Sequence, residues 1–293
     1  MIALLKKLNL TVIITFLCIS TVIAGAVVIY KYNAHYTSNF KDITIYSQVL
    51  DESRKVFIRL PRNFDPNKHY SLIIRTDGNF NLSKWDSVMA ELPAQQDTIL
   101  VSIPNQFWSN TRNRDLVPPY ARQDVNTQPR PVSENTPEIY GQADKFLTFI
   151  DSELLPYLES HYNLTNNRIL SGYSAGGSFV LYTMSTKPWL FKGYFSFSPA
   201  AWYDDMTVVR EFNQFLLQRK TENINTQPLF LYITVGGDEH PLMLKAFNSL
   251  QDNLNTNASN IIWYSQVNPE LNHSTNPVHS VKPALNFYNL QLD

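Results

Sequence analysis

Residues 168–177 read RILSGYSAGG and contain the pattern G-x-S-x-G around Ser174. The apolar residues before the pattern are typical of a short strand, and residues 178–186 after it are typical of a helix. A serine at such a turn sits on a strained backbone, and side chains two positions to either side would clash. The amides that open the helix would stabilise negative charge beside the serine. The stretch therefore predicts a nucleophilic Ser174 between a strand and a helix.

Strands and helices alternate on both sides of this stretch. Two segments rich in β-branched residues, 43–49 and 55–60, predict an antiparallel hairpin. The remaining predicted strands are short apolar runs at 71–75, 98–103, 195–197, 229–235 and 261–267. Helices are predicted at 145–160, 207–219 and 241–254. This order predicts one α/β domain, a mostly parallel central sheet with antiparallel N-terminal strands and helices on both faces.

A nucleophilic serine needs a base, and in this architecture the chain order is serine, acid, histidine. Three histidines follow Ser174, namely His240, His273 and His279. His273 lies in the loop after the strand at 261–267 and is the predicted base. His240 directly follows the predicted acid, so its side chain cannot easily reach across that acid. His279 lies near the final helix and is the alternative base.

The predicted acid lies in the turn Gly-Gly-Asp-Glu at 236–239, at the end of the strand 229–235. Both Asp238 and Glu239 fit this position. The backbone amide of Ala175 is one predicted donor to the oxyanion that forms during acyl transfer. The second donor is expected from the loop after the strand 71–75, at Gly78, Asn79 or the neighbouring Phe80.

A long proline-rich segment with little periodicity runs from residue 107 to residue 140. A loop of this length in a compact domain is usually functional or mobile. Its Arg112 and Arg114 are candidate contacts to an acidic or catecholate substrate. The alternative is a structural salt bridge with Asp115 or another nearby carboxylate.

Composition excludes several classes of protein. The chain has 293 residues, 44% of them hydrophobic, and a formal net charge of −1. Near-neutral charge argues against a nucleic-acid partner. A single cysteine excludes a disulfide framework and a cysteine-based zinc site. No cofactor and no metal are expected.

The N-terminal residues 10–30 carry no charge and are flanked by Lys6, Lys7 and Lys31. At about 1.5 Å per residue they would span a hydrocarbon core of roughly 30 Å. We therefore expect residues 1–35 to be a membrane anchor or a signal segment, and residues 36–293 to be the catalytic domain. The expected location is membrane-anchored with the catalytic domain outside the cytoplasm, periplasmic or extracellular. The alternative is secretion after cleavage behind the small residues 24–26.

Most of residues 40–288 resemble the putative esterase family of the α/β-hydrolase superfamily, which includes siderophore trilactone esterases and relatives of S-formylglutathione hydrolase. The resemblance rests on motifs at 76–78, 112–118, 146–157, 172–177, 235–239 and 284–287. It implies the α/β-hydrolase fold and ester hydrolysis, and it favours His273 over His279 and Glu239 over Asp238. Tyr173 and Asn272 depart from the family, which usually has histidine and glycine at these positions.

These residues predict a serine carboxylic ester hydrolase that acts through an acyl-enzyme on siderophore-type or other small esters. Ser174 attacks the carbonyl, His273 takes and returns the proton, and Glu239 orients the imidazole. The alternatives are a membrane-anchored acyltransferase and a non-catalytic binding protein with the same fold. The oligomeric state does not follow from the sequence.

Overall fold

The computed structural model describes residues 12–26, 39–91, 98–106, 111–121, 141–222 and 227–289. The chain forms two compact units, Met1–Asn39 and Phe40–Asp293. The predicted domain boundary between residues 35 and 36 lies outside the described residues and stays a prediction.

Residues 12–26 of the first unit form one helix. Across the described ranges, the structure contains no helix with the length and apolar character that crossing a membrane requires. This finding corrects the expected membrane anchor, the membrane as a partner and the membrane-anchored location. The ends of the predicted 10–30 segment and its flanking lysines lie outside the described residues.

The second unit is built on one eight-stranded sheet in the order β1-β2-β4-β3-β5-β6-β7-β8. Its antiparallel pairs are β1 with β2 and β2 with β4, and its other pairs are parallel. The strands are β1 Phe40–Ser47, β2 Glu52–Arg59, β3 Tyr70–Arg75, β4 Thr98–Ser102, β5 Leu164–Tyr173, β6 Gly193–Phe197, β7 Leu229–Gly236 and β8 Ile261–Asn268. The predicted mostly parallel sheet with antiparallel N-terminal strands is confirmed.

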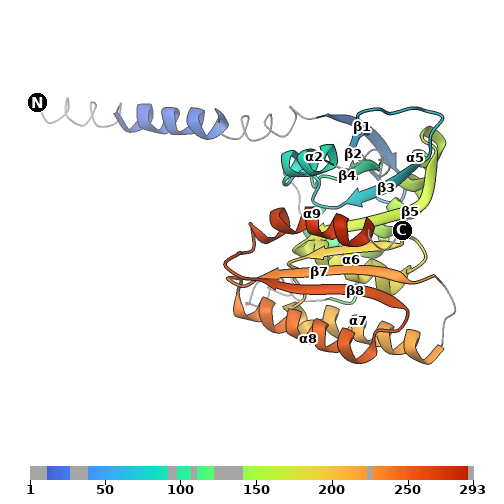
Figure 1. Ribbon diagram of the computed structural model, residues 1–293. Coiled ribbons are helices and arrows are strands. Elements are labelled where there is room, and N and C mark those ends of the chain that lie inside the picture. Colours follow the sequence, from blue (N-terminus) through green and yellow to red (C-terminus); the bar gives the residue numbers. More distant parts are fainter. Residues whose placement is uncertain are drawn as a thin grey trace, which may run out of the picture. The chain divides into compact units, whose positions relative to one another are not determined.

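Helices cover both faces of this sheet, as predicted (Figure 1). On one face α2 (Leu82–Ala90) and α9 (Asn276–Asn289) enclose a core that includes Trp85, Phe195 and Tyr288. The larger core on the other face lies beneath the remaining helical segments. These are α3 Thr111–Leu116, α4 Ala143–Phe149, the π-helical turn η3 Ile150–Leu154, α5 Leu155–His161, α6 Ala175–Thr186, α7 Tyr203–Glu222 and α8 Pro241–Asn257.

Two features differ from the expected elements. The helix predicted at 145–160 is interrupted by the π-helical turn, and α3 lies inside the segment expected to be one long loop. The α3 helix has six residues, TRNRDL, of which Thr111, Asp115 and Leu116 are buried. Its position is fixed by tertiary contact, because buried Asp115 pairs with buried Arg54 of β2 at 2.6 Å. Residues 107–110 and 122–140 of the expected loop lie outside the described residues.

Parallel pairing decides where functional side chains gather. Strands β5, β6, β7 and β8 run in the same direction, so their carboxyl ends share one edge of the sheet. Ser174 follows β5, the turn with Glu239 follows β7, and the loop with His273 follows β8. The carboxyl edge of such a sheet is where open α/β folds place their ligand sites.

Candidate active site

Ser174 occupies a sharp turn between β5 and α6. Its φ and ψ are 58° and −118°, a left-handed conformation that a non-glycine residue adopts only when its surroundings enforce it. A Cβ on Gly172 would lie 2.1 Å from the Gly176 carbonyl oxygen, and one on Gly176 would lie 2.3 Å from Thr76 Oγ1. Gly172 is therefore required by close backbone approach, and Gly176 by the Thr76 side chain packed against it, which together explain the G-x-S-x-G spacing.

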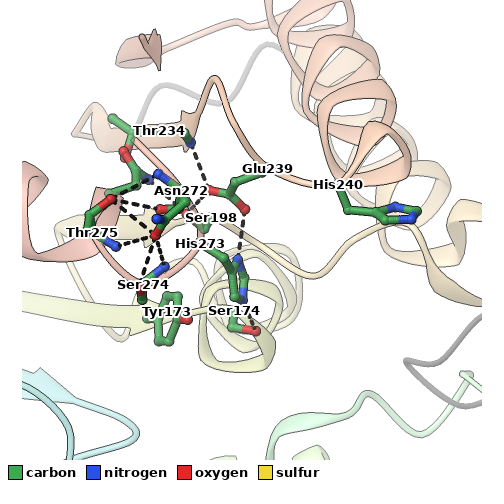
Figure 2. Close-up of polar contacts among 12 residues, drawn as sticks. Tyr173, Ser174, Ser198, Thr234, Glu239, His240, Asn272, His273, Ser274 and Thr275 are labelled. Carbon is green, nitrogen blue, oxygen red and sulfur yellow. Dashed lines mark hydrogen bonds and ion pairs between the residues drawn. The ribbon is translucent and has the colours of Figure 1, made fainter. Parts of the chain in front are cut away.

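His273 lies between Ser174 and Glu239 (Figure 2). Its Nε2 is 3.0 Å from Ser174 Oγ, and its Nδ1 is 2.7 Å from Glu239 Oε2. The His273 side chain is 39% exposed, whereas that of Glu239 is fully buried. The serine and the imidazole can therefore meet a substrate from solvent, while the carboxylate is shielded behind them.

Backbone contacts between the turn after β7 and the loop after β8 hold the acid beside the base. The Gly237 amide donates to the Asn268 carbonyl at 2.7 Å, and the Asp238 amide donates to the Leu271 carbonyl at 3.0 Å. A Cβ on Gly236 would lie 2.1 Å from the Leu271 oxygen. Gly236 thus lets the two connections pack closely enough for Glu239 to reach His273.

A buried hydrogen-bond network supports the Glu239 carboxylate from behind. Glu239 Oε1 accepts from Ser198 Oγ at 2.5 Å and from the Gly236 amide at 2.7 Å. Ser198 Oγ itself accepts from Asn276 Nδ2 at 2.8 Å, so its single proton is directed at Glu239. The Asn276 oxygen accepts from Asn268 Nδ2 at 2.6 Å, which fixes the orientation of that amide.

Ser198 and Asn276 were absent from the sequence predictions. One signal was available for Ser198, because it directly follows β6 at the carboxyl edge of the sheet. No local pattern marks Asn276, which opens α9 and is fully buried.

Asn272, which departs from the family pattern, holds the loop that carries His273. Its Oδ1 accepts from the backbone amides of Ser274 at 3.0 Å and Thr275 at 3.1 Å. Figure 2 shows these contacts clustered beside the imidazole. A side-chain cap of this kind supplies local hydrogen bonds that a glycine cannot form.

The alternative acid and base lie away from this constellation. Asp238 is exposed although it adjoins the buried Glu239. His279 is exposed on α9. His240 caps α8, where its Nδ1 accepts from the Leu242 amide at 3.3 Å.

The predicted oxyanion donors differ in whether their amides are already hydrogen-bonded within the protein. Ala175 opens α6, so its amide has no preceding helical carbonyl to bind. The Gly78 amide donates to the Ile103 carbonyl at 2.8 Å, which removes Gly78 as a donor to substrate. The Asn79 amide has no acceptor among the described residues. Ala175 and Asn79 are thus the remaining candidate pair.

The two arginines of the predicted substrate contact are paired with carboxylates. Arg112 binds buried Asp77 through two hydrogen bonds, at 2.7 and 2.9 Å. Burial alone would lower the pKa of Arg112, but the charge of Asp77 raises it. Arg114 binds Glu52 at 2.6 and 3.0 Å and also Asp115. These contacts favour the structural role that was the alternative interpretation.

Tyr173 stands where the family usually has histidine. Its ring centroid lies 4.8 Å from that of His273, and Figure 2 shows the ring beside the imidazole. Burial is the main cause that raises the pKa of Tyr173 to about 12, with Glu239 adding to the shift and Arg112 opposing it. The phenol is therefore neutral near pH 7 and serves as a wall for the imidazole.

Among the described residues, no three His, Cys, Asp or Glu side chains are grouped so that they could hold a metal ion. The groups present can form and break an ester bond without one. They provide a nucleophile, a base with its orienting acid, and backbone amides for an oxyanion.

Residues 47–282 match the model of a family described as "Putative esterase". The ferri-bacillibactin esterase BesA of Bacillus subtilis is 27% identical over 191 residues, which cover 62% of this chain and 64% of BesA. A siderophore enterobactin esterase of Emericella nidulans is 32% identical over 132 residues, covering 42% and 43% of the two chains. The matched regions thus span less than two thirds of either relative.

Solved structures share the fold. The BES protein from Bacillus cereus superposes with a TM-score of 0.72 at 23% identity, covering 85% of this chain and 96% of that one. The siderophore hydrolase EstA from Aspergillus nidulans gives a TM-score of 0.66 at 20% identity, covering 87% and 94%.

Proposed function

The chain belongs to the putative esterase family, and from this premise we propose that it hydrolyses carboxylic esters through a covalent acyl-enzyme on Ser174. The observation that carries the proposal is the continuous contact from Ser174 Oγ through His273 to buried Glu239, with distances of 3.0 and 2.7 Å. A serine hydroxyl is a weak nucleophile unless a base removes its proton as it attacks.

In the first half of the reaction, Ser174 Oγ forms a bond to the ester carbonyl carbon. His273 Nε2 accepts the hydroxyl proton, and the carbonyl oxygen becomes an oxyanion bound by the amides of Ala175 and Asn79. The tetrahedral intermediate then collapses. The bond to the alcohol oxygen breaks, and His273 returns the proton to that oxygen, so the alcohol leaves neutral.

In the second half, water attacks the acyl-enzyme. His273 takes a proton from the water, a second tetrahedral intermediate forms, and Ser174 leaves as a neutral hydroxyl when His273 returns the proton. The product is a carboxylic acid, which ionises in water. Through both halves Glu239 keeps the proton of the neutral imidazole on Nδ1 and stabilises the imidazolium.

We propose siderophore-type esters as the substrate class. This part of the proposal is supported by the names of the relatives, which are a ferri-bacillibactin esterase, an enterobactin esterase and a triacetylfusarinine C esterase. Arg112 and Arg114 are paired with carboxylates, which supports a structural role for both arginines in the proposed enzyme.

The test of the mechanism compares Ser174→Ala with Ser160→Ala in the full chain. Ser160 is exposed and its hydroxyl donates to the Tyr157 carbonyl on α5, away from the triad. We expect Ser174→Ala to abolish turnover of p-nitrophenyl acetate and labelling by a fluorophosphonate, and Ser160→Ala to leave both unchanged. A wild-type protein that is folded but takes up no fluorophosphonate would instead support the non-catalytic binding protein.

The substrate class has its own test. We expect the wild-type enzyme to hydrolyse ferri-bacillibactin with a kcat/KM well above that for p-nitrophenyl acetate. Turnover of the simple ester with none of the siderophore would refute the substrate class and leave the mechanism standing.

A further inference from the structure

A second cavity, of about 880 Å³, lies far from the triad. It is bordered by Arg168 of β5, by Lys192 just before β6 and by Leu229 at the start of β7. These positions are at the amino edge of the parallel strands. The strand β7 alone, from Leu229 to Gly236, separates the two edges by roughly 23 Å. The volume is in the range of small-molecule sites.

The charged residues in the described lining of this cavity are all cationic. Arg168, Lys192 and Arg219 line it, and its described lining contains no Asp or Glu. Glu159 pairs with Arg168 from outside the lining. Lys192 Nζ lies 5.7 Å from the centre of the Phe230 ring. Among the described residues, Arg168 is thus already paired with a carboxylate, whereas no carboxylate is paired with the lining residues Lys192 and Arg219.

Among the described lining residues, Arg168 and Arg219 each have a buried Nε without a hydrogen-bond acceptor, and no carboxylate is paired with Arg219. The residue is only 5% exposed, and its Nε has no hydrogen-bond acceptor among the described residues. Its Nη2 donates to the Asn260 carbonyl at a long 3.4 Å, and its guanidinium lies 5.7 Å from the Phe215 ring centre. A buried guanidinium with open donor positions is costly, because buried charges are stable when paired and hydrogen-bonded.

The rest of the wall is apolar and aromatic. Pro188, Leu190, Phe191 and Phe215 line the cavity, and Trp189 on its wall is 75% exposed. A large exposed indole beside a cationic cavity is typical of a binding surface, because Trp is enriched where ligands are held. The cavity thus combines an apolar and aromatic wall with donors for one negative group.

We propose that this cavity is a second binding site, specific for a small aromatic monoanion whose carboxylate or sulfonate pairs with Arg219 and whose ring packs against Trp189. The site shares no lining residue with the Ser174 triad. Its ligand therefore does not compete with the ester substrate for the triad residues. The proposal does not depend on the reaction assigned to the triad.

The test uses the full chain and two probes. 8-Anilinonaphthalene-1-sulfonate carries the anion, and N-phenyl-1-naphthylamine has the same rings without it. We expect the sulfonate to bind with one-to-one stoichiometry and to accept energy from Trp189, one of the five tryptophans of the chain, so Trp189→Phe should reduce the transfer. We expect Arg219→Gln to weaken this binding about tenfold or more, since a charge-assisted contact is lost.

Lys220→Gln is the matched control, because it removes the same charge from the next residue of α7. Lys220 is exposed and donates to the Thr256 carbonyl outside the cavity lining. We expect Lys220→Gln and Ser174→Ala to bind the sulfonate as the wild type does. Loss of binding in Ser174→Ala would overturn the proposal, because the probe would then occupy the triad cleft.

Two further outcomes decide the proposal. Equal affinity of Arg219→Gln and Lys220→Gln, or equally tight binding of the neutral probe, would overturn it. If Arg219→Gln fails to fold, Arg219→Lys and Lys192→Gln take its place. We expect Arg219→Lys to keep most of the affinity and Lys192→Gln to lose several-fold, and unchanged affinity in Lys192→Gln would then refute the anion requirement.

Discussion

Replacing Glu239 with glutamine tests how the buried network directs the proton of His273. Glu239 Oε1 faces two donors, Ser198 Oγ at 2.5 Å and the Gly236 amide at 2.7 Å. The Gly236 amide is backbone and can only donate. A glutamine must therefore place its carbonyl oxygen at this position, and its NH₂ group turns toward His273 Nδ1.

That orientation forces the wrong tautomer on the imidazole. Nδ1 must accept from the new amide, so the ring proton moves to Nε2, which lies 3.0 Å from Ser174 Oγ. An Nε2 that carries a proton cannot accept the serine proton. In a Ser-His-Asp triad the equivalent acid-to-amide change lowers kcat by about 10⁴-fold. At 1.36 kcal/mol per factor of ten, this is about 5.5 kcal/mol of transition-state stabilisation.

The assay measures kcat and KM for p-nitrophenyl acetate in Glu239→Gln and in Asp238→Asn, its neighbour in the same turn. We expect kcat to fall about 10³- to 10⁴-fold in Glu239→Gln with little change in KM, because the acid does not contact the substrate. We expect Asp238→Asn to stay within about twofold of the wild type, since Asp238 is exposed. A folded Glu239→Gln enzyme with more than a tenth of the wild-type kcat would refute the tautomer argument.

Ser198→Ala removes a buried hydroxyl that donates to the Glu239 carboxylate at 2.5 Å. We expect the free energy of unfolding to fall by about 1.5–3 kcal/mol in urea denaturation, and kcat to fall much less than in Glu239→Gln; wild-type values for both would contradict the supporting role of the hydroxyl. The second prediction concerns alkaline stability, because burial raises the pKa of Tyr288 and is the main cause that raises the pKa of Tyr194. Above about pH 10 the unfolded chain releases these phenolic protons while the folded chain keeps them, so stability is full below about pH 10 and declines above it. Urea unfolding at about pH 8 and about pH 11 measures this loss, and Tyr288→Phe should reduce it.

The sequence was sufficient to predict the backbone turn that carries Ser174. The glycines around Ser174 are required by contacts within a few residues and with the adjacent strand, so a local pattern carries the information. The apolar runs were sufficient to predict the buried strands β3, β4, β6 and β7, because strands buried on both faces are nearly continuous apolar segments. The order of strands along the chain then placed Ser174, the acid turn and the histidine loop at one edge.

Length and apolar character did not correctly predict a membrane-spanning helix in the N-terminal segment. The uncharged run at 10–30 predicts a spanning helix only if all of it is one helix. Within the described residues 12–26, the helix lacks the length and apolar character that crossing a membrane requires.

Sequence alone left the acid open between Asp238 and Glu239, and only the tertiary structure shows which of them contacts the base. These neighbours have nearly the same chemistry, and the backbone of one turn decides that Glu239 points inward and Asp238 outward. That turn is held by Asn268 and Leu271, which are distant in the chain. The hydrogen bond of the Gly78 amide also depends on tertiary structure, because it donates to the carbonyl of Ile103, which is distant in the chain. Sequence determined which residue types meet at this edge, whereas side-chain direction came from long-range packing, on which local patterns carry no information.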